Sequence, residues 1–188
     1  MIKHRIPIAL ALALVVVATW LVPPAAAQLR LPFLGKQDAE VEAYDLSPDE
    51  QVDVARMEAV FNSIRTLDAE FVQTSDTHLS VGRILLSRPD GLRMEYEEPS
   101  PHVLVGNGAA IMYHDRHLQQ TSFLPVSKTP AAFIMRDNLS MRDGVMIINF
   151  ERAGTFRRVT LVQEDEPGEG AITLIFEDNP LRFVGWRV

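Results

Sequence analysis

Hydrophobic residues recur first with the period of a helix. After residue 47 the apolar positions fall three or four residues apart, at Val54, Met57, Val60, Phe61, Ile64 and Leu67. This spacing predicts one apolar stripe along one long helix. Ser47-Pro48-Asp49-Glu50 fits the start of that helix, with Ser47 as N-cap, Pro48 at the first helical position and Glu50 completing a capping box.

From Asp68 onward the period changes to two, which is typical of strands. Asp90-Gly91, Gly106-Asn107-Gly108 and Asp115-Arg116 are turn signals between alternating segments. The pattern predicts strands from Ala69 and at 81–87, 92–96, 102–105, 110–114, 118–123, 145–152, 155–163, 171–177 and 181–188. Such a meander is antiparallel, and an antiparallel sheet can leave one face free for a ligand.

A short helical insertion interrupts the predicted strands. Thr129-Pro130 reads as a second N-cap and first helical position, followed by a helix over 131–136 that ends near Asn138. Pro125 and Gly144 flank this segment, so we expect it to lie apart from the sheet. The expected fold class is α+β, mainly antiparallel β, with one long N-terminal helix.

The first residues fit an export signal. Lys3, His4 and Arg5 form a basic region, residues 6–22 are almost wholly apolar, and Ala25-Ala26-Ala27 fits a cleavage site. The alternative, a membrane anchor, is disfavoured because the apolar run is at the short limit for a spanning helix. We expect a signal peptide at 1–27, a linker at 28–46, and one domain at 47–188.

Charge and cysteine content narrow the class of protein. The net charge of −7 disfavours nucleic-acid binding and electrostatic binding to anionic membranes. The 188 residues contain no cysteine, so disulfides, thiol chemistry and lipidation through a cysteine are excluded. An exported protein that is soluble in an extracytoplasmic compartment is the expectation.

The residues that could carry catalysis lack the required spacing. The chain has no Gly-x-Ser-x-Gly motif and no His-Glu-x-x-His motif, and Gly106-x-Gly108 belongs to a hairpin. His114 and His117 are separated by a predicted turn, and Glu95 and Glu97 fall on the outer face of their strand. We therefore expect no enzyme activity, no metal site and no cofactor.

One arginine stands out on an apolar face. Arg88 shares its strand face with Ile84 and Leu86 and directly precedes Pro89. Periodicity alone leaves two interpretations open, a strand-end side chain in solvent and a functional side chain.

Several segments in order resemble the LolA family, the periplasmic outer-membrane lipoprotein carriers. They are Leu67-Asp68-Ala69-Glu70-Phe71-Val72-Gln73, the segment 82–89 (Gly-Arg-Ile-Leu-Leu-Ser-Arg-Pro), Leu92-Arg93-Met94-Glu95-Tyr96 with Pro99, residues 104–108, and residues 129–136. The last segment is similar to the family's lid. The resemblance runs from about Ser47 to the end of the chain, and the combination is more specific than any one piece.

The resemblance implies an unclosed, half-barrel antiparallel sheet with helices as a lid over an apolar cavity. The implied activity is transport without covalent chemistry. Triacylated lipoproteins would be accepted from an inner-membrane ABC transporter and delivered to an outer-membrane receptor. We expect a periplasmic monomer. Family members continue for further strands after the stretch that matches 182–188, so we expect either a fragment or a shortened barrel.

The resemblance also assigns residues. Arg88 matches the family's gating arginine, which holds the lid shut through hydrogen bonds to backbone carbonyls; we expect its partners at the end of the lid helix, around Met135 to Asn138. Strand periodicity then predicts a cargo cavity lined by Ile84, Leu86, Leu92, Met94 and Tyr96, with Phe133 and Ile134 from the lid.

Three other functions stay open at this point. A related carrier of another lipid or glycolipid could use the same cavity. A secreted hydrolase would need a convergent polar pair inside it. A structural or stress-sensing domain could bind lipoproteins without carrying them. The outer-membrane receptor of the same superfamily is disfavoured because it needs a lipidated cysteine.

Overall fold

Two antiparallel sheets and two α-helices make up the part of the chain that the structure describes. The structure is a computed structural model, and it describes residues 41–75, 78–99 and 101–188. The predicted signal peptide at 1–27 and most of the predicted linker lie outside these residues. The described residues belong to one structural unit that spans 31–188.

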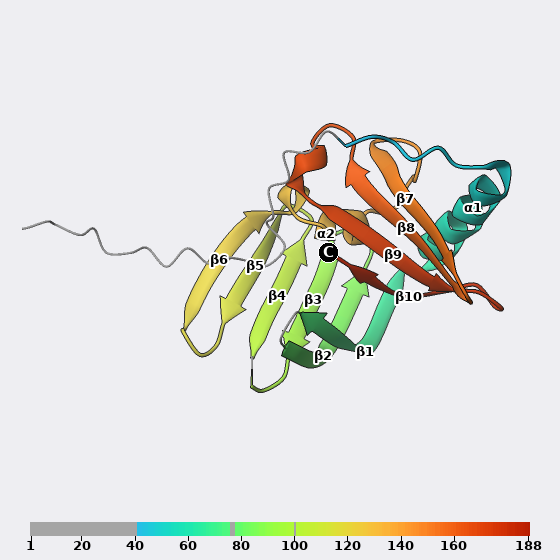
Figure 1. Cartoon of the computed structure of the whole chain (residues 1–188). Helices are drawn as coiled ribbons and strands as arrows, with labels where there is room; N and C mark the ends of the chain where they lie inside the picture. Colours follow the sequence, from blue (N-terminus) through green and yellow to red (C-terminus); the bar gives the residue numbers. More distant parts are fainter. Residues whose placement is uncertain (1–40, 76–77, 100) are drawn as a thin grey trace, which may run out of the picture. The chain divides into compact units, whose positions relative to one another are not determined.

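Sheet A is a meander of consecutive strands in the order of the sequence. It contains β1 (Thr66–Ser75), β2 (His78–Ser87), β3 (Gly91–Tyr96), β4 (His102–Asn107), β5 (Ala110–Asp115) and β6 (Gln120–Pro125). Every neighbouring pair is antiparallel. Figure 1 shows these strands as a curved layer. The order follows from the short turns, because a tight turn can join only antiparallel neighbours.

Sheet B is a second meander, in the order β10-β9-β8-β7. Its strands are β7 (Val145–Ala153), β8 (Phe156–Gln163), β9 (Ala171–Glu177) and β10 (Arg182–Arg187). The outermost described strands are β1 and β6 in sheet A and β7 and β10 in sheet B, so neither sheet closes on itself. The predicted fold class is confirmed as mainly antiparallel and unclosed, but the strands form two sheets where the sequence pattern alone predicted one meander.

The segment between the sheets contains the short helices. A 3-10 turn (Val126–Lys128) is followed by α2 (Ala131–Met135), and a second 3-10 turn (Pro167–Glu169) joins β8 to β9. All but the first residue of α2 are buried. One core cluster contains side chains of α1, α2 and both sheets, so α2 lies where the two sheets come together (Figure 1).

The long helix α1 (Pro48–Ser63) begins as its sequence predicts. Ser47 and Glu50 form the capping box, and Pro48 is at the first position. Val54, Met57 and Phe61 are buried on the predicted stripe. At the end of α1, the ring of Phe61 packs edge-on against Phe183 of β10, with centroids 5.1 Å apart.

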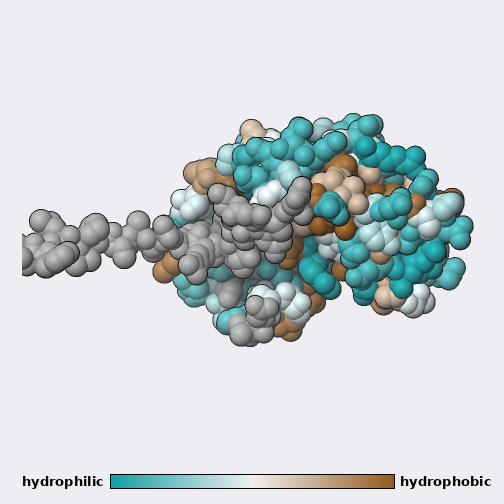
Figure 2. Space-filling model, turned by 45° about the horizontal axis from the view of Figure 1, so that its top comes forward, coloured by the Kyte–Doolittle hydropathy of each residue, from teal (hydrophilic) through white to brown (hydrophobic). Residues whose placement is uncertain are grey.

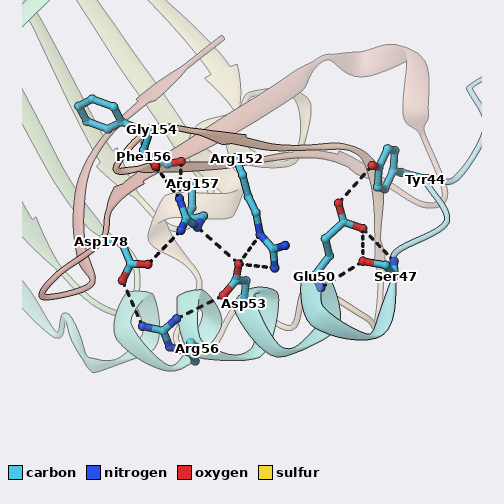
Figure 3. Close-up of polar contacts among 10 residues, drawn as sticks. All are labelled: Tyr44, Ser47, Glu50, Asp53, Arg56, Arg152, Gly154, Phe156, Arg157 and Asp178. Atoms are coloured by element: carbon cyan, nitrogen blue, oxygen red, sulfur yellow. Dashed lines mark hydrogen bonds and ion pairs between the residues drawn. The ribbon is translucent and has the colours of Figure 1, made fainter.

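Charged side chains attach α1 to sheet B (Figure 3). Asp53 accepts hydrogen bonds from Arg152 of β7 at 2.8 Å and from Arg56 at 3.2 Å, and Arg157 of β8 lies 3.4 Å from the same carboxylate. Arg56 and Arg157 both reach Asp178 at 3.2 Å. This group of five residues is called the α1 ion network below. It ties α1 to sheet B at its middle, while Phe61 ties it at its end.

Two details of the sequence interpretation are wrong. The predicted helical stripe includes Ile64 and Leu67, but α1 ends at Ser63, so that Ile64 is its extended C-cap and Leu67 is a residue of β1. Thr129 was expected to cap α2; instead its hydroxyl donates to the Val126 carbonyl at 2.9 Å, and Pro130 occupies the cap position. The hydroxyl is used by the preceding 3-10 turn, which sequence spacing alone did not reveal.

Candidate functional site

The predicted cavity residues of sheet A share one buried face. Strand pairing places Ile84 opposite Met94 and Leu86 opposite Leu92, and all four are at most 7% exposed. Tyr96 lies opposite Gly82 and is half-buried against the same core. The alternation in β2 and β3 thus selects the face that the sequence predicted.

The predicted lid residues meet this face from the other side. Phe133 and Ile134 of α2 are buried in the same core cluster as the sheet A residues. Met135 packs directly on the backbone of β4: a methyl group added at Gly106 would lie 2.8 Å from its terminal carbon. The glycine therefore lets α2 approach the sheet closely.

Arg88 connects the end of β2 to both helices. Its Nε donates a hydrogen bond to the Ile134 carbonyl at 2.8 Å, and its Nη1 donates to the Phe61 carbonyl at 2.8 Å. The guanidinium also lies over the Phe61 ring, 4.1 Å from the centroid. The predicted type of partner, a carbonyl at the end of the lid helix, is present at Ile134, one residue before the expected range. The bond to α1 was not predicted.

Arg88 is buried, which is unusual for a charged side chain. Burial, together with repulsion from Arg65, lowers the pKa of Arg88 to about 10, and Asp137 partly counters this. The side chain stays protonated at neutral pH. Its Nη2 is buried without a hydrogen-bond partner among the described residues. A buried donor without a partner costs about 1–3 kcal/mol, so the unpaired Nη2 destabilises the closed arrangement by about this amount.

The segment that follows α2 is attached to α1 by further polar contacts. The Asn62 side chain donates to the Leu139 carbonyl at 3.0 Å and accepts from the Leu139 amide at 2.9 Å. Glu58 accepts from the Met141 amide at 2.7 Å, and Arg65 pairs with Asp137. These side chains were missed by sequence analysis because single polar residues at the end of a helix give no signal for a partner about 70–85 residues away.

The residues of the predicted cavity pack together in one apolar cluster in this structure. One pocket, of about 330 Å³, lies beside Tyr44, Val54 and Met141, and a second, of about 230 Å³, lies beside Asp90, Met135 and Arg136. Neither is lined by a residue of the predicted cavity set. The face that was expected to be free for a ligand is covered by α1, α2 and sheet B, since all of them bury apolar side chains in one cluster. A cargo role for these residues stays a prediction.

The described residues on the face seen in Figure 2 are mostly hydrophilic, and hydrophobic side chains gather there in separate patches. Within 41–75, 78–99 and 101–188, no His, Cys, Asp or Glu side chains form a group of three that could hold a metal ion. No helix in these ranges is both long and apolar enough to cross a membrane.

Comparisons with known proteins agree on one family. The family model described as "Outer membrane lipoprotein carrier protein LolA" matches residues 62–188. An outer-membrane lipoprotein carrier protein of Dechloromonas aromatica is 34% identical over 95 residues, which cover 45% of this chain and 46% of that protein. One of Chromobacterium violaceum is 28% identical over 108 residues, which cover 53% and 52%.

The similarity to these two relatives covers only part of each protein. The chain spans about half the length of the curated relatives it matches. Among solved structures, a LolA superfamily protein of Nitrosomonas europaea matches 69% of this chain and 68% of its own, with a TM-score of 0.40 and 12% identity.

Proposed function

Since the chain belongs to the family of outer membrane lipoprotein carrier proteins, LolA, we propose that it is a carrier that binds lipoproteins by their acyl chains. In this proposal the protein works in the periplasm, without a cofactor and without making a covalent bond. It accepts triacylated lipoproteins released from the inner membrane by an ABC transporter. It delivers them to a receptor at the outer membrane.

The observation that carries the proposal is the way in which the apolar layer is held together. The buried face of β2 and β3 contacts α2 through apolar side chains, while Arg88 supplies hydrogen bonds between the end of β2 and both helices. Apolar contacts are non-directional, so acyl chains could replace them. A layer held by few directional bonds is suited to separate and close again.

The energetics are consistent with loading and release. Removing a methylene group from water gains about 0.8 kcal/mol, so long acyl chains strongly favour an apolar interior over water. Loading would separate α2 from sheet A and break the Arg88–Ile134 hydrogen bond, which contributes about 1.5–3 kcal/mol. Closure after release restores this bond. The competition makes binding of the chains reversible, as a carrier requires.

Paired acylated and unacylated ligands test the proposal. The purified protein is mixed with a triacylated lipoprotein and, separately, with the same lipoprotein whose acceptor cysteine is replaced by serine, and bound protein is measured by co-elution. The proposal predicts a complex with the acylated form alone. Equal binding of both forms would contradict it.

The main alternative to a lipoprotein carrier is a carrier of another lipid, and a second measurement distinguishes the two. Native mass spectrometry of protein purified from the periplasm identifies the copurifying ligand. A lipoprotein mass supports the proposal. A phospholipid or glycolipid mass, combined with failure to bind the triacylated lipoprotein, supports the alternative.

A further inference from the structure

The inner face of sheet A is organised in three rows of side chains that cross the strands. Strand pairing defines a deep row of Leu86, Leu92, Gly106 and Ile111. It defines a middle row of Ala69, Ile84, Met94, Leu104 and Tyr113. An outer row contains Phe71, Gly82 and Tyr96. Successive rows lie two residues apart on each strand, about 7 Å.

Polarity and exposure change steadily from row to row. The deep row is aliphatic and buried. In the middle row Ile84 and Met94 are buried, while Leu104 and Tyr113 are half-buried. In the outer row Phe71 and Tyr96 are aromatic and half-buried, and both pack against the core. The inner face therefore passes from a dry interior to a partly wet, aromatic margin.

Four aromatic rings form a continuous chain along this margin. Phe71 and Tyr96 meet edge-on at 5.0 Å, Tyr96 and His102 lie 6.2 Å apart, and His102 and Tyr113 lie 5.2 Å apart. These four residues are called the aromatic rim. Phe71 folds over Gly82, where an added methyl group would lie 2.8 Å from its ring. The glycine thus allows the ring to lie flat on the sheet.

The two tyrosines of the aromatic rim carry hydroxyl groups that form hydrogen bonds. The Tyr96 hydroxyl donates to the exposed side chain of Gln73 at 2.6 Å. The Tyr113 hydroxyl is 2.9 Å from His102 Nδ1. Burial raises the pKa of Tyr96 to about 12, and burial followed by the Asp115 charge raises the pKa of Tyr113. Both phenols stay protonated and can donate hydrogen bonds at neutral pH.

We propose that the aromatic rim binds the ester or amide carbonyls at the polar end of an acylated ligand whose chains lie in the deep and middle rows. This inference rests on the proposed function and adds a recognition site for the junction between chains and head group. Gln73 is a replaceable partner, because an exposed side chain can move into water when a carbonyl takes its place at Tyr96.

The charge around the aromatic rim favours an uncharged junction over a phosphate. The Asp115 carboxylate lies 3.7 Å from His102 Nδ1, and its other oxygen accepts the amides of His117 and Leu118. The hydrogen bonds from these backbone amides, of which that from Leu118 has the larger effect, lower the pKa of Asp115. The carboxylate is therefore ionised at neutral pH. A fixed negative charge next to the aromatic rim repels a phospholipid head group. Ester and amide carbonyls carry no net charge and avoid this repulsion.

Removing single hydroxyl groups tests the inference. Tyr96→Phe and Tyr113→Phe keep the rings and remove one donor each. The chain has three tyrosines, and Tyr44→Phe is the matched control because Tyr44 lies near Glu50 at the start of α1. Each variant is titrated with a synthetic triacylated lipopeptide and with a pyrene-labelled alkane that has no carbonyl group. Thermal unfolding checks that every variant is folded.

The inference predicts a selective loss. Tyr96→Phe and Tyr113→Phe should each weaken lipopeptide binding by roughly five- to tenfold, the effect of one hydrogen bond, and leave alkane binding unchanged. Tyr44→Phe should change neither. Unchanged lipopeptide affinity in both rim variants would overturn the inference while the proposed function stands. If the unsubstituted protein does not bind the lipopeptide, the proposed function and the inference fail together.

Discussion

At the scale of single residues, Arg88 has the most demanding environment. A buried guanidinium is costly unless its donors are satisfied, and here two of its nitrogens have carbonyl partners while Nη2 has none among the described residues. The same side chain therefore holds α2 closed and carries a penalty in the closed state. Such a partly satisfied contact is easier to break than a complete one.

Replacing Arg88 by leucine should favour the loaded, open state. Arg88→Leu removes both helix contacts and adds apolar surface. We expect lipopeptide binding to persist and its release to vesicles to slow by about tenfold, because the Arg88–Ile134 hydrogen bond of about 1.5–3 kcal/mol no longer stabilises the closed state. Release is followed by fluorescence of a labelled lipopeptide. Arg83→Leu is the control, since Arg83 on the same strand pairs with Asp68 in solvent. Release at the wild-type rate from Arg88→Leu would mean that Arg88 does not control the lid.

Only part of this site could be predicted from the sequence. The two-residue period places Arg88 on the same face as Ile84 and Leu86, and that placement is correct. The bond to Phe61 could not be predicted, because it depends on the end of α1 lying beside Arg88, which strand periodicity does not show. The aromatic rim was missed except for Tyr96, since its members come from four different strands.

At the scale of elements, α1 is attached differently to its two neighbours. The α1 ion network joins it to sheet B through Asp53 and Asp178, both only 12% exposed at the side chain. Asn62 and Glu58 join it to the segment after α2. Helix start signals predicted the first residue of α1, but its attachment depends on Arg152 and Arg157, about 100 residues further along the chain, and local sequence patterns do not show this pairing.

Removing the central charge of the α1 ion network should destabilise the fold. Asp53→Asn leaves Arg56, Arg152 and Arg157 close together around a neutral side chain, so we expect a loss of about 2–3 kcal/mol in the free energy of unfolding. Urea denaturation measures it. Glu151→Gln is the control: its pair with Arg158 is half exposed at the glutamate and should contribute less than about 1 kcal/mol. Equal effects of the two substitutions would show that the network does not anchor α1.

The start of α1 should weaken in acid. Hydrogen bonds from the Ser47 side chain and backbone hold the pKa of Glu50 below its usual 4.5. A carboxylate with a lowered pKa stabilises the fold above its unfolded value and loses this contribution as the pH falls. The unfolding free energy of the wild-type protein should therefore exceed that of Glu50→Gln at neutral pH, and the difference should shrink below about pH 4.5. A difference that stays constant from pH 7 to pH 3 would contradict this assignment.

At the scale of the whole molecule, two open sheets share one apolar interior with α1 and α2. Binary patterning predicted the buried faces of β2 and β3, because apolar and polar residues alternate along each of these strands. It did not predict the division into two sheets, which depends on where the insertion at 126–144 places the chain before β7. It also could not show that α1, α2 and both sheets bury apolar side chains in one cluster.

The central claim is that acyl chains enter between sheet A and α2, and clamping these elements together tests it most directly. Arg65 lies at the entry to β1 and Asp137 just after α2; the two form an ion pair, and both side chains are about half exposed. Because the chain contains no cysteine, Arg65→Cys with Asp137→Cys supplies the only two thiols for a short bis-maleimide linker with an internal disulfide. Each single-cysteine variant, treated alike, is the control.

Binding of the triacylated lipopeptide is then measured before and after the linker is cleaved with a reducing agent. The account predicts that the clamped protein does not bind the lipopeptide, that cleavage restores binding, and that both single-cysteine variants bind throughout. Full binding by the clamped protein would contradict it, because acyl chains would then reach their site without separating α2 from sheet A.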